Sequence, residues 1–183
     1  RELHAKGKES GRTVLRFLGS LTHKGYIWRF DSVDALCPKV YELADSWELA
    51  GEMLARLHRA AADNGWDTIV CCAPEEPGRI EHLLIPGLGL AFVTSREGMR
   101  YEGSAYRRIR IDAMVPAAHY RQYRSRLRFT NRMAAALRQE AVEALADAKR
   151  SHDALEAVYQ PNVDFTRADE ITARELERIK SYL

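Results

Sequence analysis

The sequence predicts an α/β fold: a mostly parallel sheet flanked by helices, with a C-terminal long-helix hairpin. Residues 40–73 read as an apolar strand, an amphipathic helix and a second apolar strand, which is the order found in parallel sheets. Residues 117–159 contain no proline or glycine and place apolar or small residues at heptad-like spacing, which indicates a long helix. We therefore expect an α/β core at 12–115 and the helical hairpin at 116–183.

Composition is typical of a globular domain. The chain has 183 residues, of which 46% are apolar and 30% charged. It contains no apolar run of about 18 residues that would predict a membrane span. The N-terminus has no apolar signal segment, and three cysteines form neither a disulfide framework nor a zinc motif. We expect a cytoplasmic protein that does not associate with membranes.

The N-terminal region is predicted with alternatives left open. Residues 1–11 are polar and are expected to form a loose lead-in or the tail of an upstream helix. Polar and apolar residues alternate from residue 12 until Gly19 interrupts the pattern. Residues 25–33 form a short segment rich in aromatic side chains. Either segment is a strand or a docking turn.

The central unit begins with a strand at 40–44. Residues 45–46 then supply helix-capping side chains, because an oxygen there can accept from the free amides of a first turn. Apolar residues from 49 to 61 follow the three-four spacing of one helical face, and Asn64 and Gly65 favour its end. The nearly continuous apolar run 68–73 predicts a second strand, parallel to the first.

The next segments are a loop at 74–78, a buried strand at 90–95 and an edge strand at 106–112 with its arginines exposed. Ligands in such sheets bind beyond the carboxyl ends of the strands, so Thr94 and Ser95 are candidates for a pocket rim. Residues at such positions are more often simple strand-end caps.

The C-terminal region is predicted to be helical. A single helix over 117–159 would be about 64 Å long at 1.5 Å per residue, so it must project from the core or break near 129–131. Pro161 ends it, and Thr166 is expected to cap a last helix with Asp169 three residues later. The two helices are expected to pack as an antiparallel hairpin along one apolar stripe.

The turn after residue 44 is unsuited to phosphate. Phosphate-binding loops use glycine-rich backbone amides followed by a lysine and a serine or threonine. This turn instead carries Asp45, Glu48 and Glu52 at the helix end that would otherwise attract an anion. These carboxylates could be metal ligands, but favourable interaction with the helix dipole accounts for them, and no metal site is predicted.

Four segments carry a resemblance to a known family. They are residues 17–25, 40–43, 80–95 and the Tyr-Gln-Pro-Asn-Val-Asp-Phe turn at 159–165. Together they resemble the second half of the tandem-repeat P-loop ATPase-like proteins of spore-forming bacteria. The resemblance implies a P-loop NTPase fold, ATP with magnesium as the ligand of intact copies, and two such halves in a full-length chain.

The chain departs from this family at the phosphate loop. The positions of the glycine-rich loop hold Asp45, Ser46 and Glu48, while Gly51 stands where the lysine would be and Glu52 where the magnesium-binding hydroxyl would be. No catalytic or phosphate-binding residue can be assigned. The resemblance therefore implies a pseudo-ATPase half with a structural or regulatory role beside an active ATP-binding copy. The partner would be a second P-loop repeat or another protein, and an ATPase with an atypical phosphate site is the alternative.

Charge is unevenly distributed. Residues 96–132 hold ten arginines and three acidic residues, a balance of 10 − 3 = +7, which leaves 2 − 7 = −5 for the rest. Four of these arginines share one helical face: Arg121, Arg124, Arg128 and Arg132. Such a face could bind nucleic acid or another anion. The simpler interpretation, which we favour, is a solvated face that pairs with acidic residues at 140–156 or in another subunit.

Two further pairs have simple structural interpretations. His82 beside Glu81 could be an acid–base pair, but a strand histidine is more often a structural hydrogen-bond partner. Cys71 and Cys72 should point to opposite faces of the sheet as buried packing residues.

Overall fold

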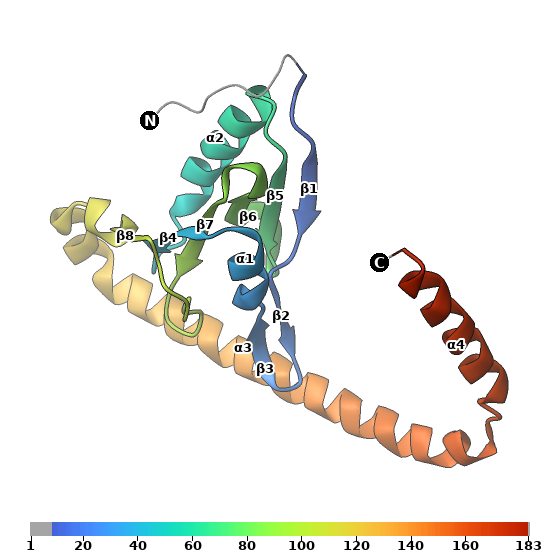
Figure 1. Cartoon of the computed structure of the whole chain (residues 1–183). Coiled ribbons are helices and arrows are strands. Elements are labelled where there is room, and N and C mark those ends of the chain that lie inside the picture. The colour runs from blue at the N-terminus through green and yellow to red at the C-terminus, as the bar shows by residue number, and fades with distance from the viewer. Residues whose placement is uncertain (1–8, 183) are drawn as a thin grey trace.

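The computed structural model describes residues 9–182 and contains a six-stranded sheet crossed at one edge by a long helix (Figure 1). The strand order is β1-β5-β6-β7-β4-β8. The strands are β1 (Thr13–Arg16), β4 (Lys39–Ala44), β5 (Thr68–Ala73), β6 (Glu76–Ile85), β7 (Leu90–Ser95) and β8 (Arg107–Arg110). Of these six strands, only β6 runs against its neighbours, so the sheet is mostly parallel as predicted.

The predicted strand–helix–strand unit is confirmed as β4, α2 (Ala50–Asp63) and β5. The two strands point the same way, but β6 and β7 lie between them in the sheet. The predicted loop at 74–78 is wrong, because β6 already begins at Glu76. Proline is tolerated there since residues 76–81 pair only with β5, and β7 joins β6 from His82 onward.

The N-terminal alternatives resolve into several elements. Residues 12–20 contain β1 and the start of a separate antiparallel hairpin of β2 (Gly19–Thr22) and β3 (Gly25–Trp28). Residues 25–33 contain β3 and the start of an unpredicted short helix, α1 (Phe30–Leu36). Of the predicted lead-in, residues 1–8 lie outside the described residues, and Gly11 donates its amide to Ala62 O at the end of α2.

The sheet has an apolar core on each face. Phe30 and Val33 of α1 belong to one core, and Leu54 and Ala61 of α2 to the other. The two cysteines separate as predicted: Cys71 lies in the α1 core and Cys72 in the α2 core. Helix α1 therefore covers one face of the sheet and α2 covers the other. Both helices lie between strands in the sequence, as in an α/β fold.

The strand β8 occupies the predicted edge position, parallel to β4. Its arginines are exposed, and Arg108 Nε lies 3.6 Å from Glu42 Oε2 on β4. A short 3₁₀ turn (Ile111–Met114) connects β8 to the long helix.

The long helix α3 (Ala117–Tyr159) is unbroken over 43 residues, so it projects and does not break near 129–131. It runs along the carboxyl edge of the sheet and extends beyond it (Figure 1). Arg138 holds it there with two hydrogen bonds to Glu75, Nε to Oε1 at 2.7 Å and Nη2 to Oε2 at 2.9 Å. The Tyr26 hydroxyl donates to the same carboxylate.

The last helix differs from its prediction. Helix α3 ends before Pro161, as expected, and a 3₁₀ turn (Gln160–Asn162) leads to α4 (Thr166–Lys180). The predicted cap at Thr166 is wrong: Thr166 is the first helical residue, and its amide and hydroxyl both donate to Asp164 Oδ1, at 2.9 and 2.6 Å.

The expected packing between the two C-terminal helices is not formed. Neither α3 nor α4 has a buried residue, and α4 rises away from α3 in Figure 1. The apolar stripe predicted between them is therefore exposed. Within residues 9–182, no helix is both long enough and apolar enough to cross a membrane.

The Arg138–Glu75 contact gives a first prediction. Arg138→Ala should increase backbone hydrogen exchange in α3 around residues 134–142, because it removes the bidentate pair that joins the helix to the sheet. Both side chains are about 40% exposed, so global stability should fall by less than about 1 kcal/mol. Arg150→Ala, which removes an ion pair to Asp147 within α3, is the control. Equal exchange in both variants would contradict the predicted role.

Candidate functional site

The loop between β4 and α2 is closed by its own carboxylate. Asp45 is 2% exposed, and its two carboxylate oxygens accept from Leu49 N and Ala50 N, each at 2.8 Å. Amides at the start of a helix are the groups that hold phosphate in anion-binding helices. The Asp45 carboxylate therefore occupies the donors that a phosphate would need.

Glu48 is held in an unusual backbone conformation. Its φ is +58°, a left-handed region that favours glycine and costs other residues about 1–3 kcal/mol. The carboxylate pairs with Arg79 Nη2 at 2.8 Å and with Arg96 Nε at 3.4 Å. Two charge contacts thus offset the backbone strain.

The other residues predicted at the degenerate phosphate loop, Ser46, Gly51 and Glu52, have different surroundings. The amide and hydroxyl of Ser46 both donate to the Asp112 carboxylate at 2.8 Å, which ties the loop to the turn before α3. Gly51 packs against Arg79, and a Cβ added there would lie 3.3 Å from the arginine Cγ. Glu52 is exposed on α2, 3.8 Å from Arg59. The structure brings Asp45, Ser46 and Glu48 together and leaves Glu52 on the helix surface.

The two strand-end candidates are buried. Thr94 is 3% exposed and donates its amide to His82 Nδ1 at 3.1 Å. Ser95 is 4% exposed, and its hydroxyl accepts from Tyr101 N at 3.0 Å. The Ser95 hydroxyl therefore acts as a structural acceptor, whereas Thr94 contributes its backbone amide and its buried hydroxyl has no hydrogen-bond partner among the described residues.

A β-bulge brings Glu81 and His82 together. On β5, Cys71 pairs with His82 and Cys72 pairs with Ile80, so Glu81 is the extra residue of β6. Because a bulge turns neighbouring side chains toward one side, His82 Nε2 lies 3.6 Å from Glu81 Oε2. The bulge places a carboxyl group and an imidazole, both almost fully buried, beside the candidate loop.

The positive charge of Arg96 lies next to the buried carboxylate of Glu81. Its Nη1 lies 2.7 Å from Glu81 Oε1, although the approach is not aligned as a hydrogen bond. Burial raises the pKa of Glu81, and the charge of Arg96 opposes that rise. Arg96 thus joins buried Glu81 to Glu48 of the loop.

Burial disfavours the charged form of His82. Burial lowers its pKa to about 3, and the positive charges of Arg96 and Arg79 act in the same direction. Because the Thr94 amide donates to Nδ1, the neutral ring carries its proton on Nε2, on the side of Glu81. This favours the structural interpretation of the pair over an acid–base role.

A cavity of about 760 Å³ separates the loop from α3. Its walls include Trp47, Glu48 and Arg96 from the sheet edge, and Tyr120, Tyr123 and Arg138 from the helix. The rings of Trp47 and Tyr120 are 5.6 Å apart. A second cavity of about 470 Å³ shares Arg96 and Arg138 and reaches the β2–β3 hairpin. The carboxyl ends of β4 and β7 therefore face a hollow with an aromatic wall.

The arginines of this hollow are already paired. Arg96 contacts Glu81 and Glu48, and Arg138 contacts Glu75. Arg138 lowers the pKa of Glu75 to about 2, and the Tyr26 hydroxyl adds to this effect despite partial burial. An anion entering the hollow would have to displace a carboxylate from its arginine.

The arginine face of α3 is exposed. Within the part of the chain that the structure describes, no ion pair joins these four residues to an acidic side chain, including those at 140–156. The residues are Arg121, Arg124, Arg128 and Arg132. Pairing with acidic side chains among residues 9–182 therefore does not account for this face.

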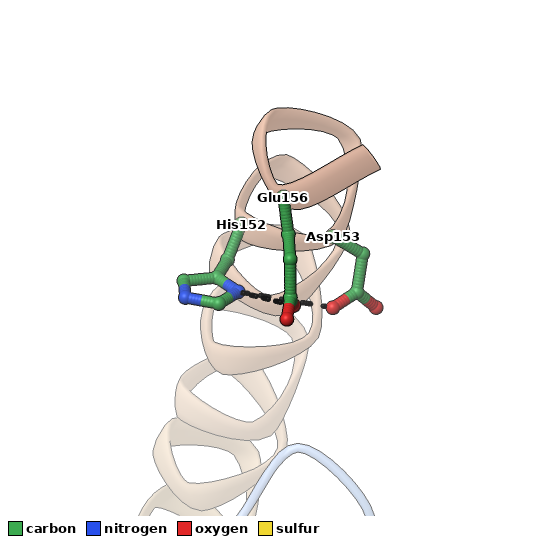
Figure 2. Close-up of side chains that lie close together, drawn as sticks. All are labelled: His152, Asp153 and Glu156. Atoms are coloured by element: carbon green, nitrogen blue, oxygen red, sulfur yellow. Dashed lines mark ion pairs between the residues drawn. The ribbon is translucent and has the colours of Figure 1, made fainter. Parts of the chain in front are cut away.

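A cluster on the distal part of α3 was not predicted. His152, Asp153 and Glu156 approach one another (Figure 2), with His152 Nδ1 3.6 Å from Glu156 Oε2 and 3.9 Å from Asp153 Oδ1. Their positions i, i+1 and i+4 on a helix were the available signal. His152 is 63% exposed and Asp153 also pairs with Lys149, so surface ion pairing explains the cluster and we assign no metal to it.

Comparisons with family models, curated proteins and solved structures give no match for this chain. The geometry of the loop and its arginines is therefore the basis of the functional argument. Sequence reasoning singled out the acidic loop but did not connect it to Arg79, Arg96 or Arg138, because these residues come from distant parts of the chain.

The buried imidazole predicts a pH dependence of stability. From pH 6.5 down to about 3, the unfolded chain binds a proton at His82 that the folded chain does not, so this residue lowers stability as pH falls. The slope from one such group is at most about 1.4 kcal/mol per pH unit. His82→Asn keeps an acceptor for the Thr94 amide without titrating. Urea unfolding between pH 7 and 4 should show a shallower decline for this variant, and equal slopes would contradict the prediction.

Proposed function

We propose that this chain is a P-loop NTPase-like domain whose own phosphate loop is degenerate, and that it serves as a non-hydrolysing structural or regulatory half beside an active ATP-binding copy. The observation that carries the proposal is the Asp45 carboxylate on the first amides of α2. A triphosphate would meet a negative charge where it needs free N–H donors.

The position of the loop supports the comparison with P-loop proteins. It connects β4 to α2 within a mostly parallel sheet, and P-loop proteins place their phosphate loop between a strand and a helix. The lysine and hydroxyl positions hold Gly51 and Glu52. Arg79 and Arg96 are the nearby positive charges that could take the place of the missing lysine. Both contact Glu48, so they would have to release this carboxylate before they could bind a phosphate.

The remaining surfaces support a role in association. The sheet has an apolar core on each face, and the exposed 43-residue helix α3 lines the cavity beside the loop. Such a domain retains the means to contact a partner after the phosphate chemistry is lost. The partner in this proposal is a second P-loop repeat or another protein.

Isothermal titration with Mg-ATP tests the proposal. The chain should give no binding at micromolar ligand. Replacing Asp45 and Glu48 together by Ala should increase affinity for inorganic pyrophosphate, because two amides lose their carboxylate and Arg79 and Arg96 each lose one of their two carboxylate partners. Glu52→Ala, which removes an exposed carboxylate from the same helix, should leave the weak binding unchanged.

Two results would count against this function. Micromolar binding of Mg-ATP by the unmodified chain would overturn it. ATP hydrolysis that persists when Asp45, Glu48 and Glu52 are all replaced by Ala would support the alternative of an ATPase with an atypical phosphate site, located away from these carboxylates.

A second candidate function is nucleic-acid or anion binding along α3. The observation that favours it is the exposed arginine face, which has no acidic partner among residues 9–182. Tyr120 and Tyr123 lie on the same part of the helix and are partly exposed, so they are available for stacking on bases. Arginines on one face of a helix are suited to neutralise successive phosphates.

Fluorescence anisotropy with a single-stranded oligonucleotide tests this candidate. Binding should weaken with salt, and replacing Arg121, Arg124 and Arg128 by Ala should reduce the slope of log K against log salt by roughly one per arginine. The matched control replaces three exposed arginines of α4, namely Arg167, Arg174 and Arg178, and should bind normally. Absence of binding at low salt would remove this candidate.

A further inference from the structure

The cavity beside the loop between β4 and α2 has an aromatic wall on α3. Its volume, about 760 Å³, is in the range of small-molecule binding sites. Tyr120 and Tyr123 belong to this wall and are 36% and 48% exposed. Tyr120 lies against Trp47, whereas Tyr123 has no ring contact with another aromatic side chain among residues 9–182. The Tyr123 ring is therefore available to stack on a flat group that enters the cavity.

The interior of this cavity suits an uncharged group. Its two arginines are already held by carboxylates, since Arg96 contacts two of them and Arg138 contacts Glu75. A phosphate group would find no free cation there. Glu97 also lines the cavity and is exposed, and its carboxylate makes no ion pair or hydrogen bond with the residues that the structure describes. This carboxylate is suited to accept hydrogen bonds from the N–H groups of a flat ring.

The arginine face borders the same wall of the cavity. At 100° per residue, most of the cavity-lining side chains of α3 lie within about 40° of Leu127 around the helix axis. Arg124, Arg128 and Arg121 lie on one side of this wall, at about 60°, 100° and 120° from Leu127, and Arg132 follows at about 140°. All four are exposed. A row of positive charge therefore runs along one flank of an aromatic cavity whose own charges are matched.

These two surfaces together define the chemistry of a ligand that fits both. It carries negative charges along a chain and a flat, uncharged ring on a side branch, which is the chemistry of a nucleic acid. From Arg121 to Arg132 the arginine face extends about 17 Å along the helix axis, which is longer than one nucleotide. Bases in a duplex are paired and stacked, so only a single strand can place one in the cavity.

We propose that the cavity binds one unstacked base of a single-stranded nucleic acid whose phosphates follow the arginine face. The base stacks on Tyr123, beside Trp47 and Tyr120, and Glu97 accepts from its N–H groups. The proposal rests on the second candidate function, nucleic-acid binding along α3, and adds to it a contact that depends on the base. It does not depend on the pseudo-ATPase function.

Fluorescence anisotropy of the full chain at low salt tests the base contact. One probe is a single-stranded oligothymidylate of about 12 nucleotides, and the other is an abasic strand of the same length, which keeps the phosphates. The oligothymidylate should bind about tenfold more tightly, because stacking of a base on an aromatic side chain contributes about that much. The difference should appear with DNA and with RNA, since stacking involves the base and not the sugar.

Tyr123→Leu removes the ring but keeps an apolar side chain. It should weaken binding of the oligothymidylate about tenfold and leave binding of the abasic strand unchanged. Phe129→Leu is the matched control, because Phe129 is an aromatic side chain of the same helix that is 59% exposed and lies about 160° from Leu127. This variant should bind both strands normally.

Failure of the base contact is distinguishable from failure of the function on which it rests. Equal affinity for the two strands, or unchanged affinity after Tyr123→Leu, would overturn the base contact. The candidate function survives that result if replacing Arg121, Arg124 and Arg128 by Ala still weakens binding of both strands. Absence of binding by either strand at low salt would remove both the base contact and the candidate function.

Photo-cross-linking locates the bound base. A single-stranded oligonucleotide with bromouracil in place of thymine should attach to peptides that contain Trp47, Tyr120 or Tyr123. Attachment only to peptides from other parts of the chain, for example from α4, would overturn the proposal.

Discussion

Carboxylates at the carboxyl edge of the sheet must each be matched by amides or arginines, and this requirement organises the candidate site. The Asp45 carboxylate accepts from the amides of Leu49 and Ala50 at the start of α2, and Glu48 pairs with Arg79 of β6 and with Arg96, which follows β7. Buried Glu81 takes Arg96, since a buried carboxylate without a partner is costly. Glu75 accepts two hydrogen bonds from Arg138, which hold α3 against the turn between β5 and β6. The groups that would recognise an anion are thus present but internally compensated.

The same compensation explains two local irregularities. Glu48 keeps a glycine-like φ because its carboxylate is held from two sides. The bulge at Glu81 turns an acidic side chain beneath the loop, where Arg96 reaches it. Both features cost backbone regularity, and both concentrate at the end of the sheet where α/β proteins bind ligands. At this end of the sheet the protein's own side chains occupy the donors of the loop and its arginines.

The long helix links this site to the molecular surface. Its first half forms the aromatic wall opposite Trp47 and carries the exposed arginines, and its second half extends beyond the sheet (Figure 1). One side therefore shapes the hollow, while another presents apolar residues to solvent.

Local sequence determined the elements whose signal is contained in one segment. The apolar runs of β4, β5 and β7, the periodicity of α2 and the uninterrupted stretch of α3 specify their own structure, because period and breakers act over neighbouring residues. The acidic residues of the loop between β4 and α2 were also evident from the sequence. Tertiary structure alone decided that β6 returns antiparallel despite Pro77, that Arg96 joins Glu81 to Glu48, and that α4 leaves α3 exposed. These outcomes depend on charge pairing and packing between residues far apart in the chain, which no local pattern encodes.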